Sequence, residues 1–353
     1  MSASDGTVVG TTQIVNNGSA AERFNLVLVA EGYRQSELSQ FAAHAQQFVD
    51  RLFSTPPFDE LQCSFNVFRV DVASNESGAD DPAACGGTGA SVATYFDASF
   101  CNGGIQRLLL VDGMSVINVV NAQIPQWHQV LVIVNSPTWG GAGGQIGTTS
   151  VAGGWENIAI HEMGHSAYGL ADEYEYWSGC GVDTTQNSYT GAEPAQPNIT
   201  ADSNRATIKW GSLVAASTPM PTTTNADCSF CDPQPNPLPT GTTGAFEGAG
   251  YFHCGCFRPE FDCMMRNLSP FCAVCRQRIR QVMSPYMPSG GCPAPVFPGS
   301  NFIECFFRTI VNLLLILVLV LLAWIPSIRC LIKQLWFRVT HCRSGNTNRC
   351  IRL

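Results

Sequence analysis

Hydrophobic and polar positions along the first half of the chain follow two periodicities. Short stretches rich in β-branched, aromatic and other apolar residues indicate buried strands, and they cover residues 24–30, 65–72, 108–111 and 129–135. Residues 35–53 instead place apolar side chains at helical spacing, among them Phe41, Ala45, Phe48 and Leu52. Strands that alternate with helices predict an α/β fold with a mixed sheet.

Residues 155–168 predict a second helix, which carries His161-Glu162-Met163-Gly164-His165. Two histidines four residues apart project from one face of a helix, so their imidazoles can occupy neighbouring corners of a tetrahedral Zn²⁺ site. Glu162 is placed to take a proton from a metal-activated water and to pass it to a leaving amine. The bare pentapeptide also occurs by chance on amphipathic helices, so the flanking residues matter.

The residues after this helix offer a third ligand. Gly169 can end the helix in a left-handed conformation, and Asp172 follows it at the G-x-x-D spacing of the metzincin pattern H-E-x-x-H-x-x-G-x-x-H, in which Asp sometimes comes last. Here the glycine lies one residue later than in that pattern. Glu173 is therefore an alternative ligand, and Asp172 could instead be an acidic residue at the helix end.

Two further segments are expected beside this helix. Residues 261–266 could form a methionine-containing turn below the metal, although Met265 could equally be ordinary core. Residues 145–151 are expected to form the edge strand of the sheet above the helix, where an extended substrate would bind by strand addition.

The chain has 16 cysteines in 353 residues, a density that favours disulfides in an oxidising compartment. The alternative is a second, structural zinc held by CxxC pairs. The separation between Cys228-x-x-Cys231 and Cys272-x-x-Cys275 is much longer than in a compact zinc ribbon. Residues 180–250 are rich in Thr, Pro, Asn and Gly, which predicts an irregular region held by a few crosslinks.

Composition excludes one class of partner. A net charge of -8 and a pI near 5.2 make nucleic acid a poor candidate, because phosphate contacts need clustered Lys and Arg. The hydrophobic fraction of 45% is sufficient for a sizeable core.

The C-terminal part differs in kind. Residues 286–302 are rich in Pro and Gly and are expected to form a linker. Residues 303–328 are expected to form a transmembrane helix, because the 20 residues 309–328 are almost wholly apolar and would span ~30 Å. The alternative for this apolar stretch is a buried core helix. The alternative for the tail that follows it is a basic helix lying on the membrane surface beside an anchor of either orientation.

The tail, residues 329–353, is basic, which predicts that it stays in the cytoplasm while the domain of residues 1–285 lies outside the cell or is secreted. The first ten residues lack the regions of a secretory signal, so export would need another route or a signal outside this sequence.

Several separated segments resemble one family. HEMGHSAYGLADEY at 161–174 is similar to the active-site segment of the bacterial IgA-peptidase family of zinc metallopeptidases, and LVAEGY at 28–33, FRVDVASNESGADDP at 68–82, FEGAGYFHCGCFRPEFDCMMRN at 246–267 and FCAVCR at 271–276 agree with it. The resemblance implies a metzincin-like zinc endopeptidase that acts on proteins or peptides. It assigns His161, His165 and Asp172 as ligands and Glu162 as general base. The alternatives are a non-catalytic surface binding or adhesion protein on a peptidase fold and a zinc amidase that acts on cell-wall peptides.

Overall fold

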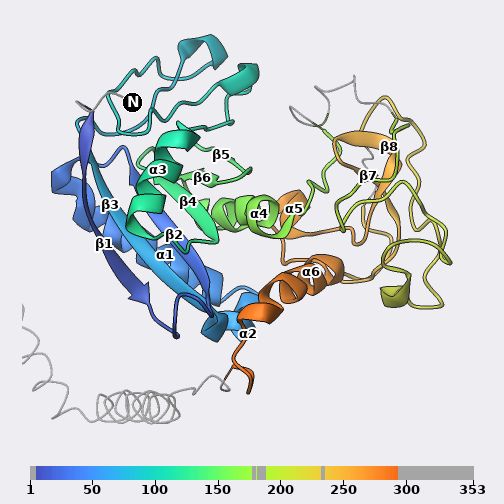
Figure 1. Ribbon diagram of the computed structural model, residues 1–353. Helices are drawn as coiled ribbons and strands as arrows, with labels where there is room; N and C mark the ends of the chain where they lie inside the picture. Colours follow the sequence, from blue (N-terminus) through green and yellow to red (C-terminus); the bar gives the residue numbers. More distant parts are fainter. Residues whose placement is uncertain (1–4, 177–179, 181–187, 232–234, 293–353) are drawn as a thin grey trace, which may run out of the picture. The chain divides into compact units, whose positions relative to one another are not determined.

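A six-stranded mixed sheet forms the core of the N-terminal half of the protein (Figure 1). The structure is a computed structural model that describes residues 5–176, 180, 188–231 and 235–292. The strand order is β1-β3-β2-β4-β6-β5, with β3, β2, β4 and β6 parallel and with β1 and β5 antiparallel to their neighbours at the two edges. The strands are β1 (Gly6–Val15), β2 (Phe24–Glu31), β3 (Phe65–Ser74), β4 (Gln129–Val134), β5 (Gly141–Ala142) and β6 (Gly147–Ser150).

The central strands are buried because their sequences are almost continuously apolar. Every residue of β2 and of β4 is buried, as expected for parallel strands with both faces covered. Helices α1 (Leu38–Phe53) and α4 (Trp155–Tyr168) pack against each other, α1 against β2 and β3 and α4 against β4 and β6. The helix that carries the two histidines is therefore fixed against the middle of the sheet.

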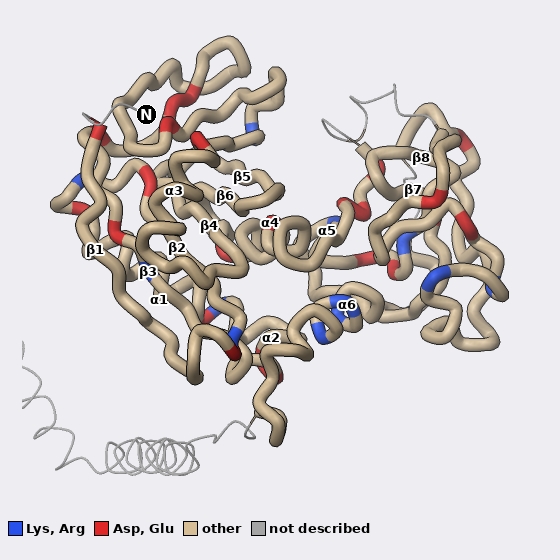
Figure 2. Tube along the Cα trace, in the orientation of Figure 1, with Lys and Arg blue, Asp and Glu red and all other residues tan. Residues whose placement is uncertain are grey.

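The remaining elements surround this core. The other helices are α2 (Phe58–Leu61), α3 (Gly113–Gln123), α5 (Met264–Asn267) and α6 (Ala273–Met283), and a separate hairpin consists of β7 (Phe246–Ala249) and β8 (Phe252–Arg258). Short 3-10 turns cover Gln35–Glu37, Gln62–Ser64, Ala83–Cys85, Asn102–Gly104, Gly211–Leu213 and Ser284–Tyr286. Apart from a group on α6, Lys and Arg are scattered along the described chain (Figure 2).

The mixed α/β fold expected from the sequence is confirmed, with two corrections. The strand predicted over residues 108–111 is wrong: Leu108 bridges to Gly141 and Leu110 bridges to Ser99, and two single bridges to different segments do not make a ladder. The edge strand was also misplaced. β6 has neighbours on both sides, and the two-residue β5 occupies the edge.

Disulfides, the first interpretation of the cysteines, are confirmed. They join Cys63 to Cys292, Cys85 to Cys101, Cys180 to Cys231 and Cys228 to Cys254. Two of them hold the irregular stretch that precedes β7. A zinc ribbon shared by the two CxxC pairs is wrong, because both cysteines of the first pair are oxidised. Cys256, Cys263, Cys272 and Cys275 are free and buried.

The described residues belong to one compact unit. The predicted transmembrane helix, the basic tail and all but the first residues of the predicted linker lie outside the described residues. Within residues 5–176, 180, 188–231 and 235–292, none of the helices has both the length and the apolar character needed to cross a membrane.

Candidate metal centre

Helix α4 and the turn after it bring three of the predicted site residues together. The Nε2 atoms of His161 and His165 lie 3.1 Å apart. Asp172 Oδ1 lies 3.0 Å from His161 Nε2 and 3.3 Å from His165 Nε2. One ligand atom from each of the three residues thus lies within 4.8 Å of the others, which is the spacing that a single metal ion needs.

The turn that delivers Asp172 begins at Gly169. This residue is left-handed, with φ 64° and ψ 33°, and its N–H donates to the carbonyl of His165 at 3.1 Å. The N–H of Leu170 donates to the carbonyl of Gly164 at 3.0 Å, and the Leu170 side chain is buried. These bonds satisfy the end of the helix and reverse the chain. The glycine shift relative to the metzincin pattern still leaves Asp172 beside both histidines.

The second nitrogen of each imidazole is held by the backbone. His161 Nδ1 lies 2.9 Å from the carbonyl oxygen of Met264, and His165 Nδ1 lies 2.8 Å from that of Leu170. A carbonyl oxygen can only accept, so Nδ1 carries the hydrogen and donates it in both rings. In the neutral imidazole each Nε2 then presents its lone pair to the cluster, which is the arrangement seen around metal-binding histidines.

The predicted methionine turn lies against α4 at Gly164. Met265, at the start of α5, is fully buried, and its Sδ comes so close to Gly164 that a Cβ at that position would lie 2.4 Å from it. Gly164 thus allows the thioether to pack closely against α4, at a position in the helix between the two histidines. Because the preceding carbonyl, that of Met264, binds His161, the same turn also fixes an imidazole.

Glu162 lies next to His161 and is only 8% exposed. Burial raises the pKa of its carboxyl group above the ordinary value, although the charges of the two histidines act in the opposite direction. Burial also raises the pKa of Asp172, but the hydrogen bonds and charges of the two histidines outweigh it and lower this pKa well below the usual range. Perturbed groups that cluster in a cleft are typical of functional sites.

A cleft passes over these residues. One cavity of about 320 Å³ is lined by His161, Glu162, His165, Asp172, Tyr174, Tyr251, Ile105, Arg107, Leu108 and residues 141–144. A second of about 240 Å³ shares His161, Glu162, Arg107 and Tyr174, and continues toward Trp139, Ile158, Tyr176 and residues 266–268. Glu162 therefore has open space on two sides, as a residue acting on an extended chain would need.

Three residues around the centre were not foreseen. The Tyr251 hydroxyl donates to Asp172 Oδ2, the Arg107 guanidinium lies 5.9 Å from the centre of the Tyr174 ring, and all three side chains line the cleft. Arg107 and Tyr251 lie far from the motif in the sequence, and no local pattern marks them. Glu173, the alternative third ligand, does not reach this centre. Its carboxylate lies instead among Cys263, Cys272 and Cys275.

Comparison with known proteins follows the same segments. The sequence model of a family described as IgA peptidase M64 matches residues 12–232 and 236–283. This range includes the sheet apart from the first residues of β1, and also α4, the turn to Asp172 and the methionine turn. None of the curated proteins matches the sequence.

Proposed function

The chain belongs to the IgA peptidase M64 family, and we propose that it is a zinc-dependent endopeptidase whose metal is held by His161, His165 and Asp172. The observation that carries the proposal is the convergence of two imidazole Nε2 atoms and one carboxylate oxygen beside a buried glutamate. Family membership supports peptidase chemistry. It does not name the substrate, and immunoglobulin is not assumed.

The residues fit a metal ion. Asp172 Oδ1 lies 3.0 and 3.3 Å from the two Nε2 atoms, and each imidazole directs its Nδ1–H to a backbone carbonyl. When both imidazoles are neutral, these three atoms are all acceptors that face one another, and a cation between them would satisfy all three. Two imidazoles and a carboxylate with an open position are a usual donor set for catalytic Zn²⁺.

The side chains around the metal have separate roles in the proposed reaction. Bound Zn²⁺ would polarise the substrate carbonyl and acidify a water. Glu162 then takes the proton of the attacking water and delivers it to the leaving amine. Burial of Glu162 suits this role, because it raises the pKa of the carboxyl group. A raised pKa lies closer to the pKa values of the groups with which the carboxylate exchanges the proton. Tyr251 holds Asp172 through its second oxygen.

Substrate binding is proposed along residues 142–144, next to the position in β5 whose outer edge is already paired, since Gly141 donates to the carbonyl of Arg107 and accepts from the N–H of Leu109. Ala142, Gly143 and Gly144 line the cleft next to His165, and glycine is needed there because a Cβ at Gly143 would lie 2.7 Å from the Cβ of His165. The main chain of this segment is thus close enough to the centre to bind an extended peptide by strand addition. This replaces the edge expected at residues 145–151.

The test is cleavage of a peptide library by the full chain, before and after removal of metal by a chelator and after return of one equivalent of Zn²⁺ to the chelated protein. We expect internal cleavage that disappears with the chelator and returns with zinc. Unchanged cleavage by metal-free protein would contradict the proposal. Cleavage of cell-wall peptides alone would indicate the amidase, and intact binding without cleavage would indicate the binding protein.

The location is a further proposal. Four disulfides favour an oxidising compartment, which supports a secreted or surface-exposed domain, with residues 303–328 as a membrane anchor and residues 329–353 inside the cell. Protease treatment of intact cells tests this. A catalytic domain that is digested only after the membrane is broken would place it inside.

A further inference from the structure

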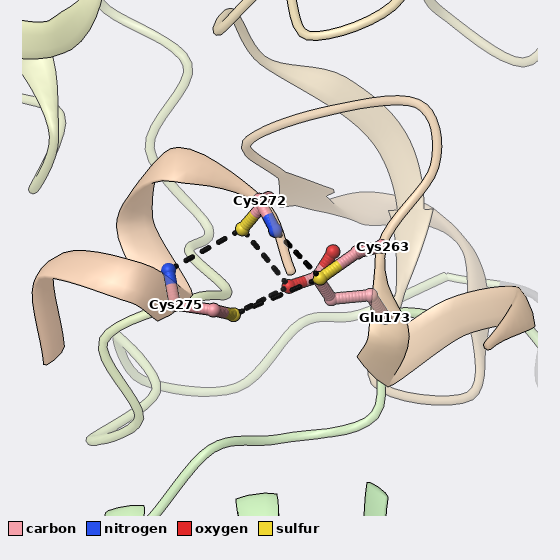
Figure 3. A group of neighbouring side chains, drawn as sticks. All are labelled: Glu173, Cys263, Cys272 and Cys275. Atoms are coloured by element: carbon pink, nitrogen blue, oxygen red, sulfur yellow. Dashed lines mark hydrogen bonds between the residues drawn. The ribbon is translucent and has the colours of Figure 1, made fainter. Parts of the chain in front are cut away.

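A second cluster of ligand-type side chains lies apart from the catalytic residues. Glu173, Cys263, Cys272 and Cys275 are all fully buried, and one ligand atom from each lies within 4.8 Å of the others (Figure 3). They come from three segments: the chain after Asp172, the residue before α5, and the N-terminal end of α6. Nothing in the proposed peptidase chemistry uses them.

Their spacing matches a tetrahedral ion. With metal–sulfur and metal–oxygen distances of about 2.3 and 2.0 Å, a tetrahedron has edges of roughly 3.8 Å between sulfurs and 3.5 Å between sulfur and oxygen. The sulfurs of Cys263 and Cys275 lie 3.8 Å apart. Glu173 Oε1 lies 3.3 Å from Cys275 Sγ and 3.7 Å from Cys272 Sγ.

The surroundings favour negative charge on the sulfurs. The backbone N–H of Cys272 donates to Cys263 Sγ, and that of Cys275 donates to Cys272 Sγ, both at 3.4 Å. Cys272 is also the N-cap of the 11-residue helix α6, and the positive end of a helix stabilises a thiolate. These donors lie where a set of anionic ligands needs them.

The carboxylate gives independent support. Asn198 Nδ2 donates to Glu173 Oε1 at 2.9 Å, but Glu173 Oε2 is buried and has no hydrogen-bond partner among the described residues. A carboxylate held among three thiols in the interior is costly unless a cation neutralises its charge. Thiols that merely fill a core, as free cysteines often do, would not require a carboxylate among them.

A disulfide accounts for the cluster poorly. Three sulfurs cannot all be paired with one another, and the separation of 3.8 Å between Cys263 and Cys275 is well beyond the ~2.05 Å of a disulfide bond. Eight other cysteines of the described chain are paired in disulfides, whereas these three sulfurs lie close together and remain free. We propose that Glu173, Cys263, Cys272 and Cys275 bind a second metal ion, a structural Zn²⁺ with no open coordination position.

Such an ion would fix two chain segments that carry or support the residues of the histidine centre. Glu173 directly follows Asp172, and Cys263 directly precedes Met264, whose carbonyl accepts from His161. The two segments are also joined by the N–H of Glu173, which donates to the carbonyl of Met265 at 2.7 Å. The four ligands are therefore positioning residues for the first centre, and they do not touch the substrate.

Metal content and cobalt absorption of the full chain test the proposal without reference to activity. We expect two zinc ions per wild-type chain and one per chain of the His161→Ala/His165→Ala variant. Replacement by Co²⁺ should give an intense thiolate-to-cobalt absorption band in both proteins, because the first centre contains no sulfur. Thiolates bind Zn²⁺ and Co²⁺ well but are poor ligands for Mg²⁺ or Ca²⁺.

Matched variants identify which cysteines give rise to the thiolate-to-cobalt band. Cys275→Ser should lose it, while Cys256→Ser, at a buried free cysteine outside the cluster, should keep it. Should Cys275→Ser fail to fold, the wild type and the double histidine variant still decide. Folded wild-type protein with at most one zinc and no thiolate band would overturn the proposal, as would peptide mapping that finds two of the cluster cysteines joined in a disulfide.

Discussion

Asp172 and Glu173 are neighbours in the chain, yet their carboxylates belong to two different clusters. Asp172 Oδ1 lies 3.0 Å from His161 Nε2, while Glu173 Oε1 lies 3.3 Å from Cys275 Sγ. A shift of one residue in the turn after Gly169 would exchange the two carboxylates. The path of this turn therefore determines which group each acid can serve, and substitution at either position should have its own consequence.

Asp172→Ala should lower zinc affinity at the histidine centre by at least about 100-fold, because loss of even an outer-shell partner costs 10–100-fold. Activity should fall with it. Glu173→Gln should leave this centre loaded. Zinc titration of the two variants, with a competing chelator, provides the comparison. Loss of the histidine-centre metal in the Glu173 variant, and its retention in the Asp172 variant, would move the ligand by one residue.

Glu162→Gln should reduce kcat by roughly 10²–10⁴-fold or more, because the amide cannot accept the proton of the attacking water. The bound metal should remain, since Glu162 is not a proposed ligand. Turnover and zinc content are measured on the same sample. A variant that turns over like wild type would exclude Glu162 as the base, whereas a variant that has lost its metal would indicate a ligand role.

Gly143→Ala should lower the free energy of unfolding by about 1–3 kcal/mol, the usual cost of overpacking. The added methyl would lie 2.7 Å from the Cβ of His165, an atom that α4 holds in place. Gly144→Ala is the control, because its nearest neighbour beyond the adjacent residues is 3.8 Å away, and it should change stability by less than about 0.5 kcal/mol. Equal effects in denaturant unfolding would mean that the loop does not lie against α4.

Glu31 should make stability depend on pH. Burial raises its pKa from 4.5 to about 7, although the N–H groups of Phe96 and Ala98 donate to its oxygens at 3.0 and 3.1 Å. The folded state therefore holds this proton more tightly than the unfolded state. The contribution of Glu31 to the free energy of unfolding is therefore fully present below pH 4.5. It is lost as pH rises through about 7, and the total loss is up to about 3 kcal/mol.

Glu31→Gln is neutral at every pH and isolates this effect. As pH rises from 4.5 to 7, the wild type should lose stability relative to the variant. Urea unfolding of both proteins at intervals across this range measures it. Parallel pH profiles would show that Glu31 does not titrate in the window.

The sequence predicted those parts of the fold and site that depend on local periodicity. Strands β2 and β4, helix α1 and the helix with His161 follow from apolar spacing, which the core preserves. Strand β1 was not foreseen, because its Thr- and Gly-rich sequence is partly exposed and has no continuous apolar run. Residues 108–111 are apolar enough for a strand, but whether a ladder forms depends on neighbours that the local sequence does not identify.

Long-range contacts account for the rest. The CxxC pair at Cys272 and Cys275 was visible in the sequence. Its partners Cys263 and Glu173 lie 9 and 99 residues before Cys272, and these separations match no fixed ligand spacing. Tyr251 reaches Asp172 only because the β7–β8 hairpin packs beside the turn. Such residues are chosen by tertiary structure, so a motif search finds the first ligands of a site and misses those that support it.

The disulfide between Cys63 and Cys292 joins positions 229 residues apart, and the strands and helices from β3 to α6 lie between them. A peptidase is exposed to cleavage by neighbouring copies of itself. A single nick anywhere between these two cysteines would leave both fragments covalently tied, so a nicked molecule would migrate as one species until a reducing agent separated its pieces.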